Sequence, residues 1–131
     1  MLEDQGLVAL QGPDAAAVLA KHLPADFDLG ALTFGRSAIV PLDARGKRVE
    51  CHVARGGYTG EDGFEVSIPP EDTERVAQAL AEDERVQLAG LAARDSLRLE
   101  AGMCLYGHDL DESCLLYTSD AADDMQWGDF R

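Results

Sequence analysis

Apolar and polar residues alternate along several short stretches of the chain, which is the pattern of β-strands that bury one face. The alternation is clearest at 64–68, where the apolar side chains of Phe64, Val66 and Ile68 are separated by polar ones. This pattern, together with a short apolar run next to glycine, predicts strands at 6–10, 36–42, 48–55, 64–68 and 86–88. The polar segment 43–47 contains glycine and predicts a hairpin between the second and third of these strands.

A helical period in other stretches predicts helices at 13–23, 69–82 and 90–101. Proline at the start of the first two suits the first turn of a helix. In the last helix Ala92, Leu97 and Leu99 belong to a broad apolar arc, which we expect to face the core. The order of the elements predicts an α+β fold, closest to a ferredoxin-like sandwich in which helices pack on an antiparallel or mixed sheet.

Composition narrows the class of protein and its partners. The 131 residues suit one domain and carry a formal charge of −14, with 25 acidic and 11 basic side chains. This charge disfavours nucleic acid and anionic membranes as partners, and no apolar run approaches membrane-spanning length. Three cysteines without C-x-x-C spacing indicate a reducing compartment. Cys51 and His52 are neighbours in a predicted strand and point to opposite faces, so we predict no metal site there.

A glycine-rich stretch at 56–63 lies between two of the predicted strands. Its four glycines let the backbone adopt positive φ and approach a neighbour closely, and Glu61 and Asp62 lie among them. The stretch matches neither the Walker phosphate loop nor the dinucleotide-binding glycine pattern. Two interpretations stay open: a bulged hairpin turn with solvated acids, or a turn that presents a ligand site. Glu65, on the polar side of the following strand, is accordingly either solvated or part of a polar cavity.

Two arginines of the last predicted helix, Arg94 and Arg98, lie one helical turn apart and can point the same way. Paired guanidinium groups suit a carboxylate or a phosphate, so these residues allow an anion site. They equally allow a solvated face with a bridge between Asp95 and Arg98 that contributes little stability. Glu100 is unexpected under either interpretation, because it falls within the apolar arc.

Four segments carry a resemblance to a known family. They read LVALQGP at 7–13, GYTGEDGFE at 57–65, LAGLAARDSLRLEAG at 88–102 and CLYGHDLDE at 104–112. In this order they closely resemble the aminomethyltransferase of the glycine cleavage system, the T-protein family, over about residues 3–112. The folate domains of sarcosine and dimethylglycine dehydrogenases share the Gly-Tyr-Thr-Gly element but match the later blocks less well.

The resemblance implies tetrahydrofolate as cofactor and a lipoyl-bearing H protein as partner. Enzymes of this family take an aminomethyl group from the dihydrolipoyl arm of H protein, release ammonia and pass the one-carbon unit to tetrahydrofolate. Glu65 and Arg94 match folate contacts of the family, so we expect their side chains to lie near each other. Tyr58 is placed to supply a flat wall. The resemblance also implies the cytoplasm of a bacterium, or the mitochondrial matrix if the source is eukaryotic.

Some segments of the family have no match in this sequence. The catalytic aspartate of the family lies N-terminal to these segments and a further folate contact lies in a C-terminal barrel, so we expect a truncated, inactive piece without a catalytic residue. Residues 113–131 do not resemble the family, so we expect a non-native or disordered tail, with a divergent acidic tail as the alternative. A non-catalytic folate-type binding or regulatory module is the competing function.

Overall fold

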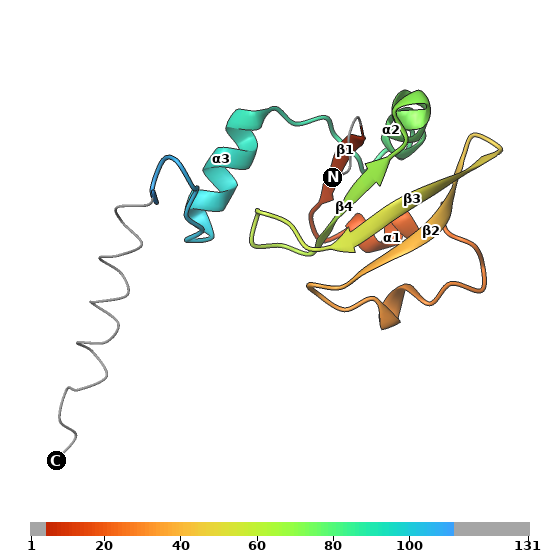
Figure 1. Ribbon diagram of the computed structural model, residues 1–131, viewed down its shortest axis with the longest axis horizontal. Helices are drawn as coiled ribbons and strands as arrows, with labels where there is room; N and C mark the ends of the chain where they lie inside the picture. The colour runs from red at the N-terminus through yellow and green to blue at the C-terminus, as the bar shows by residue number, and fades with distance from the viewer. Residues whose placement is uncertain (1–4, 112–131) are drawn as a thin grey trace, which may run out of the picture.

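The computed structural model describes residues 5–111, and the predicted tail at 113–131 lies outside them (Figure 1). The elements follow one another as β1 (Gly6–Gln11), α1 (Ala15–Ala20), the short 3-10 helix η1 (Leu29–Ala31), β2 (Ser37–Ala44), β3 (Lys47–Arg55), β4 (Gly63–Ile68), the 3-10 helix η2 (Pro70–Asp72), α2 (Thr73–Ala81) and α3 (Leu91–Glu100). Within this part of the chain, no helix is long and apolar enough to cross a bilayer.

The four strands form one antiparallel sheet in the order β1-β4-β3-β2. Strands β2 and β3 are joined by the predicted hairpin, and Arg45 and Gly46 at its tip have φ of 56° and 80°. Positive φ at both positions is what a two-residue turn needs to follow the twist of the strands. β4 lies beside β1 and pairs with it along the whole length of both strands, which places Gln11 opposite Gly63.

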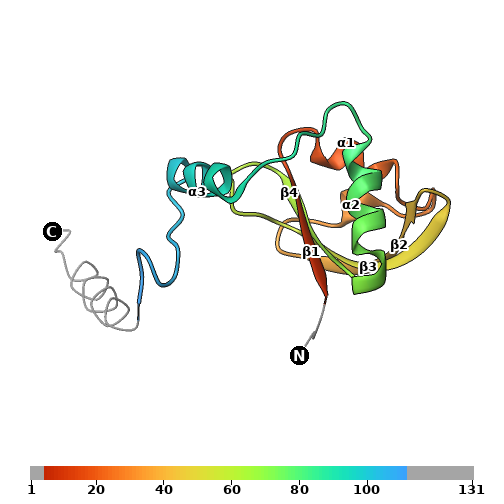
Figure 2. The same cartoon turned by 90° about the horizontal axis from the view of Figure 1, so that it is seen from above.

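Helices α1 and α2 cover the same face of the sheet (Figure 2). The core between them contains residues from all four strands and both helices: Leu10, Val18, Leu19, Val40, Leu42, Val49, Cys51, Val53, Phe64, Val66, Ile68, Val76, Ala79 and Leu80. On the other face Leu7 and Ile39 are 62% and 66% exposed. The predicted α+β class, an antiparallel sheet with helices packed on it, is therefore confirmed.

The strand predicted at 86–88 does not form. These residues belong to the connection between α2 and α3, where Val86 N donates to Asp83 O at 2.8 Å and closes a turn. Val86 packs against the core without pairing to a strand, whereas Leu88 is 92% exposed. A run of three residues is too short for alternation to separate a strand from a loop.

Helix α3 presents its faces in the opposite way to the prediction. Leu97 and Leu99 of the apolar arc are 41% and 56% exposed, and Glu100 within that arc is exposed as well. Arg98, from the polar arc, is only 4% exposed. Within residues 5–111, α3 therefore makes its ion pairs through Arg94 and Arg98, while the side chains of Leu97 and Leu99 stay partly exposed.

Candidate functional site

The glycine-rich stretch forms the loop between β3 and β4 and is tied at its base. Gly56 N donates to Gly63 O at 2.9 Å, and Arg55 donates to both carboxylate oxygens of Asp62 at 2.9 and 2.7 Å. The loop bends through Gly60, which has a φ of 78° that favours glycine. This confirms a hairpin turn, but one of its two acids is fixed in an ion pair rather than solvated.

The Arg55 guanidinium group also fixes neighbouring parts of the fold. It donates to Leu32 O at 3.0 Å and lies 5.4 Å from the centre of the Phe64 ring, so the loop is tied to the core. Hydrogen bonds from this guanidinium group lower the pKa of the Asp62 carboxyl below its ordinary value.

Lowering the pH is expected to remove the contribution of this pair to stability. In the unfolded chain an aspartate has a pKa of about 3.9, whereas the pKa of Asp62 in the folded chain is lower. The stabilisation is thus complete above the unfolded pKa and is lost as the pH falls through the folded pKa. The urea midpoint of unfolding is measured at about pH 6 and at about pH 3. The difference between the two midpoints should be smaller in Asp62→Asn than in the parent chain. Equal differences would show that the pair does not contribute.

Glu65 and Arg94 meet although they are distant in sequence. β4 directs Phe64 into the core and therefore Glu65 to the uncovered face, where Arg94 Nη2 donates to Glu65 Oε1 at 2.8 Å. Their side chains are 35% and 38% exposed, respectively, so the pair is accessible to a ligand. The predicted proximity is confirmed, and the folate role of these residues stays a prediction.

A close contact between backbone and helix brings α3 to this position. A Cβ atom built on Gly60 would lie 2.8 Å from the Cβ of Ala101, just after α3, so only glycine allows the loop to approach so closely. Figures 1 and 2 both show α3 beside this loop, beyond the end of the sheet. The loop therefore determines where α3 presents Arg94. Tyr58, the third predicted site residue, lies half-buried in the same loop.

Arg94 and Arg98 do not form the paired anion site that was one of the two open interpretations. Arg98 turns away from Arg94 and bonds to Asp95 at 2.8 Å, to the carboxylate of Asp109 and to Met103 O at 3.1 Å. Its hydrogen-bonding capacity is used within its own segment. Of the alternative interpretation, the bridge between Asp95 and Arg98 is confirmed, whereas the solvated face is not, because Arg98 is 4% exposed.

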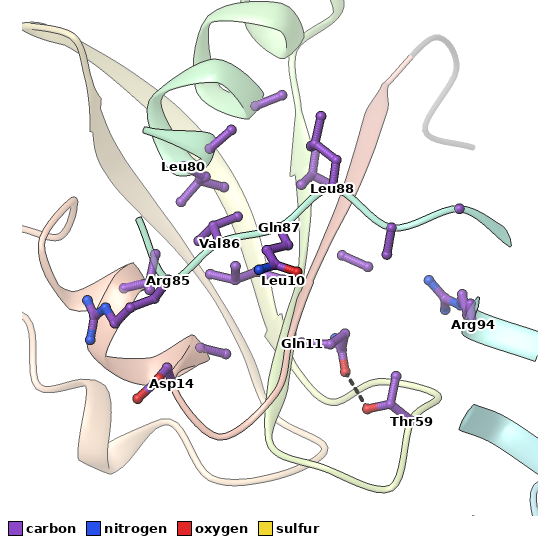
Figure 3. A pocket seen from close by; sticks show the side chains of 18 of the residues that line it. Leu10, Gln11, Asp14, Thr59, Leu80, Arg85, Val86, Gln87, Leu88 and Arg94 are labelled. Atoms are coloured by element: carbon purple, nitrogen blue, oxygen red, sulfur yellow. Dashed lines mark hydrogen bonds between the residues drawn. The ribbon is translucent and has the colours of Figure 1, made fainter. Parts of the chain in front are cut away.

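Sequence reasoning missed Gln11, which contacts the loop from the neighbouring strand. Its Nε2 donates to Gly56 O at 3.1 Å and Phe64 O at 3.3 Å. Its Oε1 accepts from the Thr59 hydroxyl at 3.3 Å (Figure 3). No local pattern identifies this role, because it depends on the pairing of β1 with β4.

A cavity of about 640 Å³ extends along β1 and ends beside this loop (Figure 3). Its walls are mostly apolar and include Leu10, Leu80 and Leu88, and its polar groups come from Gln11, Asp14, Thr59, Arg85, Gln87 and Arg94. Apolar walls with a few polar groups are typical of small-molecule sites. Arg94 lines this cavity and also bonds Glu65, so it connects the cavity with the carboxylate.

Comparisons of this sequence with known proteins give consistent results. A family profile described as the GCVT N-terminal domain matches residues 1–122. A probable mitochondrial aminomethyltransferase of Schizosaccharomyces pombe is 48% identical over 126 residues, covering 96% of this chain and 30% of the relative. The mitochondrial aminomethyltransferase of Homo sapiens is 48% identical over 124 residues, covering 95% of this chain and 28% of the relative.

A solved structure gives the same result in three dimensions. The glycine cleavage system aminomethyltransferase T from Bartonella henselae superposes with a TM-score of 0.67 at 46% identity. The match covers 81% of this chain and 27% of that protein. This chain thus spans less than a third of the length of each of these relatives.

Proposed function

Because the chain belongs to the GCVT N-terminal domain family, we propose that it supplies part of the tetrahydrofolate site of an aminomethyltransferase of the glycine cleavage system. The observation that supports this most directly is the ion pair between Glu65 and Arg94 on the uncovered face of the sheet. Both residues stand in segments that resemble the family, and their side chains meet although 29 positions separate them.

The residues fit the chemistry of a pterin. An amino-pyrimidine edge offers two adjacent N–H donors, and a carboxylate accepts two parallel hydrogen bonds. Arg94 bonds one oxygen of Glu65, each carboxylate oxygen has two lone pairs, and a third of the side chain is exposed, so acceptor capacity remains. Arg94 also orients the Glu65 side chain through its hydrogen bond, and Tyr58 offers an aromatic surface from the adjoining loop.

Within an aminomethyltransferase, this segment would bind and orient rather than transfer protons. Tetrahydrofolate, when bound, accepts the one-carbon unit that the dihydrolipoyl arm of H protein delivers as an aminomethyl group, with release of ammonia. Glu65 and Arg94 would hold the pterin end in register with that arm. The compartment depends on the source organism: it would be the mitochondrial matrix in a eukaryote and the cytoplasm in a bacterium.

An exchange of segments tests the proposal. The matched segment of the Bartonella henselae enzyme is replaced by that of this chain, and the chimera is assayed for tetrahydrofolate-dependent ammonia release with lipoylated H protein. We expect the chimera to be active and the isolated 131-residue chain to be inactive. A folded chimera that does not bind tetrahydrofolate would contradict the proposal, and binding without turnover would favour a non-catalytic binding module.

A further inference from the structure

The side chain of Gln11 occupies the space between the two ends of the glycine-rich loop. A Cβ atom built on Gly57 would lie 1.8 Å from Gln11 Oε1, and one built on Gly63 would lie 2.3 Å from the same atom. Neither glycine has a positive φ, so the backbone conformation itself does not require glycine at either position. The two glycines are needed because Gln11 fills the place of their side chains.

The amide of Gln11 holds the loop at three points. It donates to the carbonyl groups of Gly56 and Phe64, one at each end of the loop. It also accepts from the Thr59 hydroxyl near the tip of the loop (Figure 3). The antiparallel register of β1 and β4 delivers the side chain there. The loop conformation is therefore determined by a side chain outside the hairpin as well as by the Arg55–Asp62 pair.

The conformation of the loop also affects the proposed site. It contains Tyr58, and through Gly60 it meets Ala101, which fixes the position of α3 and thus of Arg94 against Glu65. We propose that Gln11 is a positioning residue for tetrahydrofolate binding, acting through the loop on Tyr58 and on the Glu65–Arg94 pair. This inference rests on the proposed function, because it concerns the same site.

Two different substitutions are expected to give the same defect. Gln11→Ala deletes the amide, and Gly57→Ala expels it from the loop while glutamine stays in the sequence. In the chimeric enzyme each is expected to raise KM for tetrahydrofolate about tenfold and to change kcat less than about twofold. The double variant should be no worse than either single one, since both remove the same contact. Gln78→Ala, at an exposed glutamine of α2, is the matched control and should change neither constant.

Other results would overturn the inference. If both single variants lower the urea midpoint but leave KM unchanged, Gln11 is a structural residue only, and multiplied defects in the double variant would exclude a shared contact. If the parent chimera does not bind tetrahydrofolate, the proposed function fails, and the loop is then tested in the 131-residue chain. There the amide NMR signals of Thr59 and Gly60 should move alike in Gln11→Ala and Gly57→Ala; unmoved signals would refute the link.

Discussion

Glu65→Gln is expected to weaken tetrahydrofolate binding about 10- to 150-fold in the chimeric enzyme, equivalent to about 1.5–3 kcal/mol. The substitution keeps the shape of the side chain but removes its charge and replaces one acceptor oxygen with a donor. It therefore loses a charge-assisted hydrogen bond to the ligand and the ion pair with Arg94. Because Glu65 is on the uncovered face of β4, stability should change little.

Titration calorimetry with tetrahydrofolate checks this expectation. Glu50→Gln is the matched control, since it makes the same chemical change at an exposed glutamate of the neighbouring strand β3. The control should bind as tightly as the parent enzyme. Unchanged affinity in Glu65→Gln, or an equal loss in Glu50→Gln, would contradict the assignment and leave Glu65 as a solvated acid on a hairpin.

Phe64→Ala is expected to lower the free energy of unfolding by about 3–5 kcal/mol. The side chain of Phe64 is fully buried in the core, and the Arg55 guanidinium group lies over its ring at 5.4 Å. Truncation removes buried apolar surface, leaves a cavity and deprives Arg55 of its aromatic neighbour. This is a large part of the stability of a small domain.

Urea unfolding of the 131-residue chain measures the effect. Phe64→Leu should cost less than Phe64→Ala, because it leaves a smaller cavity. A loss below about 1 kcal/mol in Phe64→Ala would show that β4 is not packed as described. We therefore expect substitution of Phe64 to lower stability and substitution of its neighbour Glu65 to lower tetrahydrofolate affinity, because the two side chains point to opposite faces of β4.

The strands and the β2–β3 hairpin were predictable because their determinants are local. Alternation identified β3 and β4 within a residue or two of their observed ends, and the turn at Arg45 and Gly46 lies inside the predicted 43–47 segment. The α+β class followed from the order of these elements.

The orientation of α3 was not predictable in this way. Hydrophobic periodicity indicates which side of a helix can be buried, but not which side meets the segments at hand. Here Arg94 bonds Glu65 and Arg98 is buried, while Leu97 and Leu99 are 41% and 56% exposed. The polar side of the helix is the one that organises the candidate site.

The candidate site was predictable only in part. Strand alternation placed Glu65 away from the core, and the family resemblance brought in Arg94, so their proximity was expected. Gln11 was missed because its partners lie 45 and 53 positions away, and only the register of β1 and β4 unites them. Arg55 and Asp62 lie near the two ends of the loop and only seven positions apart. Pairing β3 with β4 would therefore have predicted the bond between them.

A crystal structure of the chimeric enzyme with tetrahydrofolate tests the central claim most directly. The account predicts that the Glu65 carboxylate accepts hydrogen bonds from the amino-pyrimidine edge of the pterin at about 2.7–3.2 Å. Arg94 should remain bonded to Glu65 or contact the ligand, and Tyr58 should lie beside the pterin. A ligand bound with its pterin away from β4, leaving Glu65 in contact with Arg94 alone, would contradict the account.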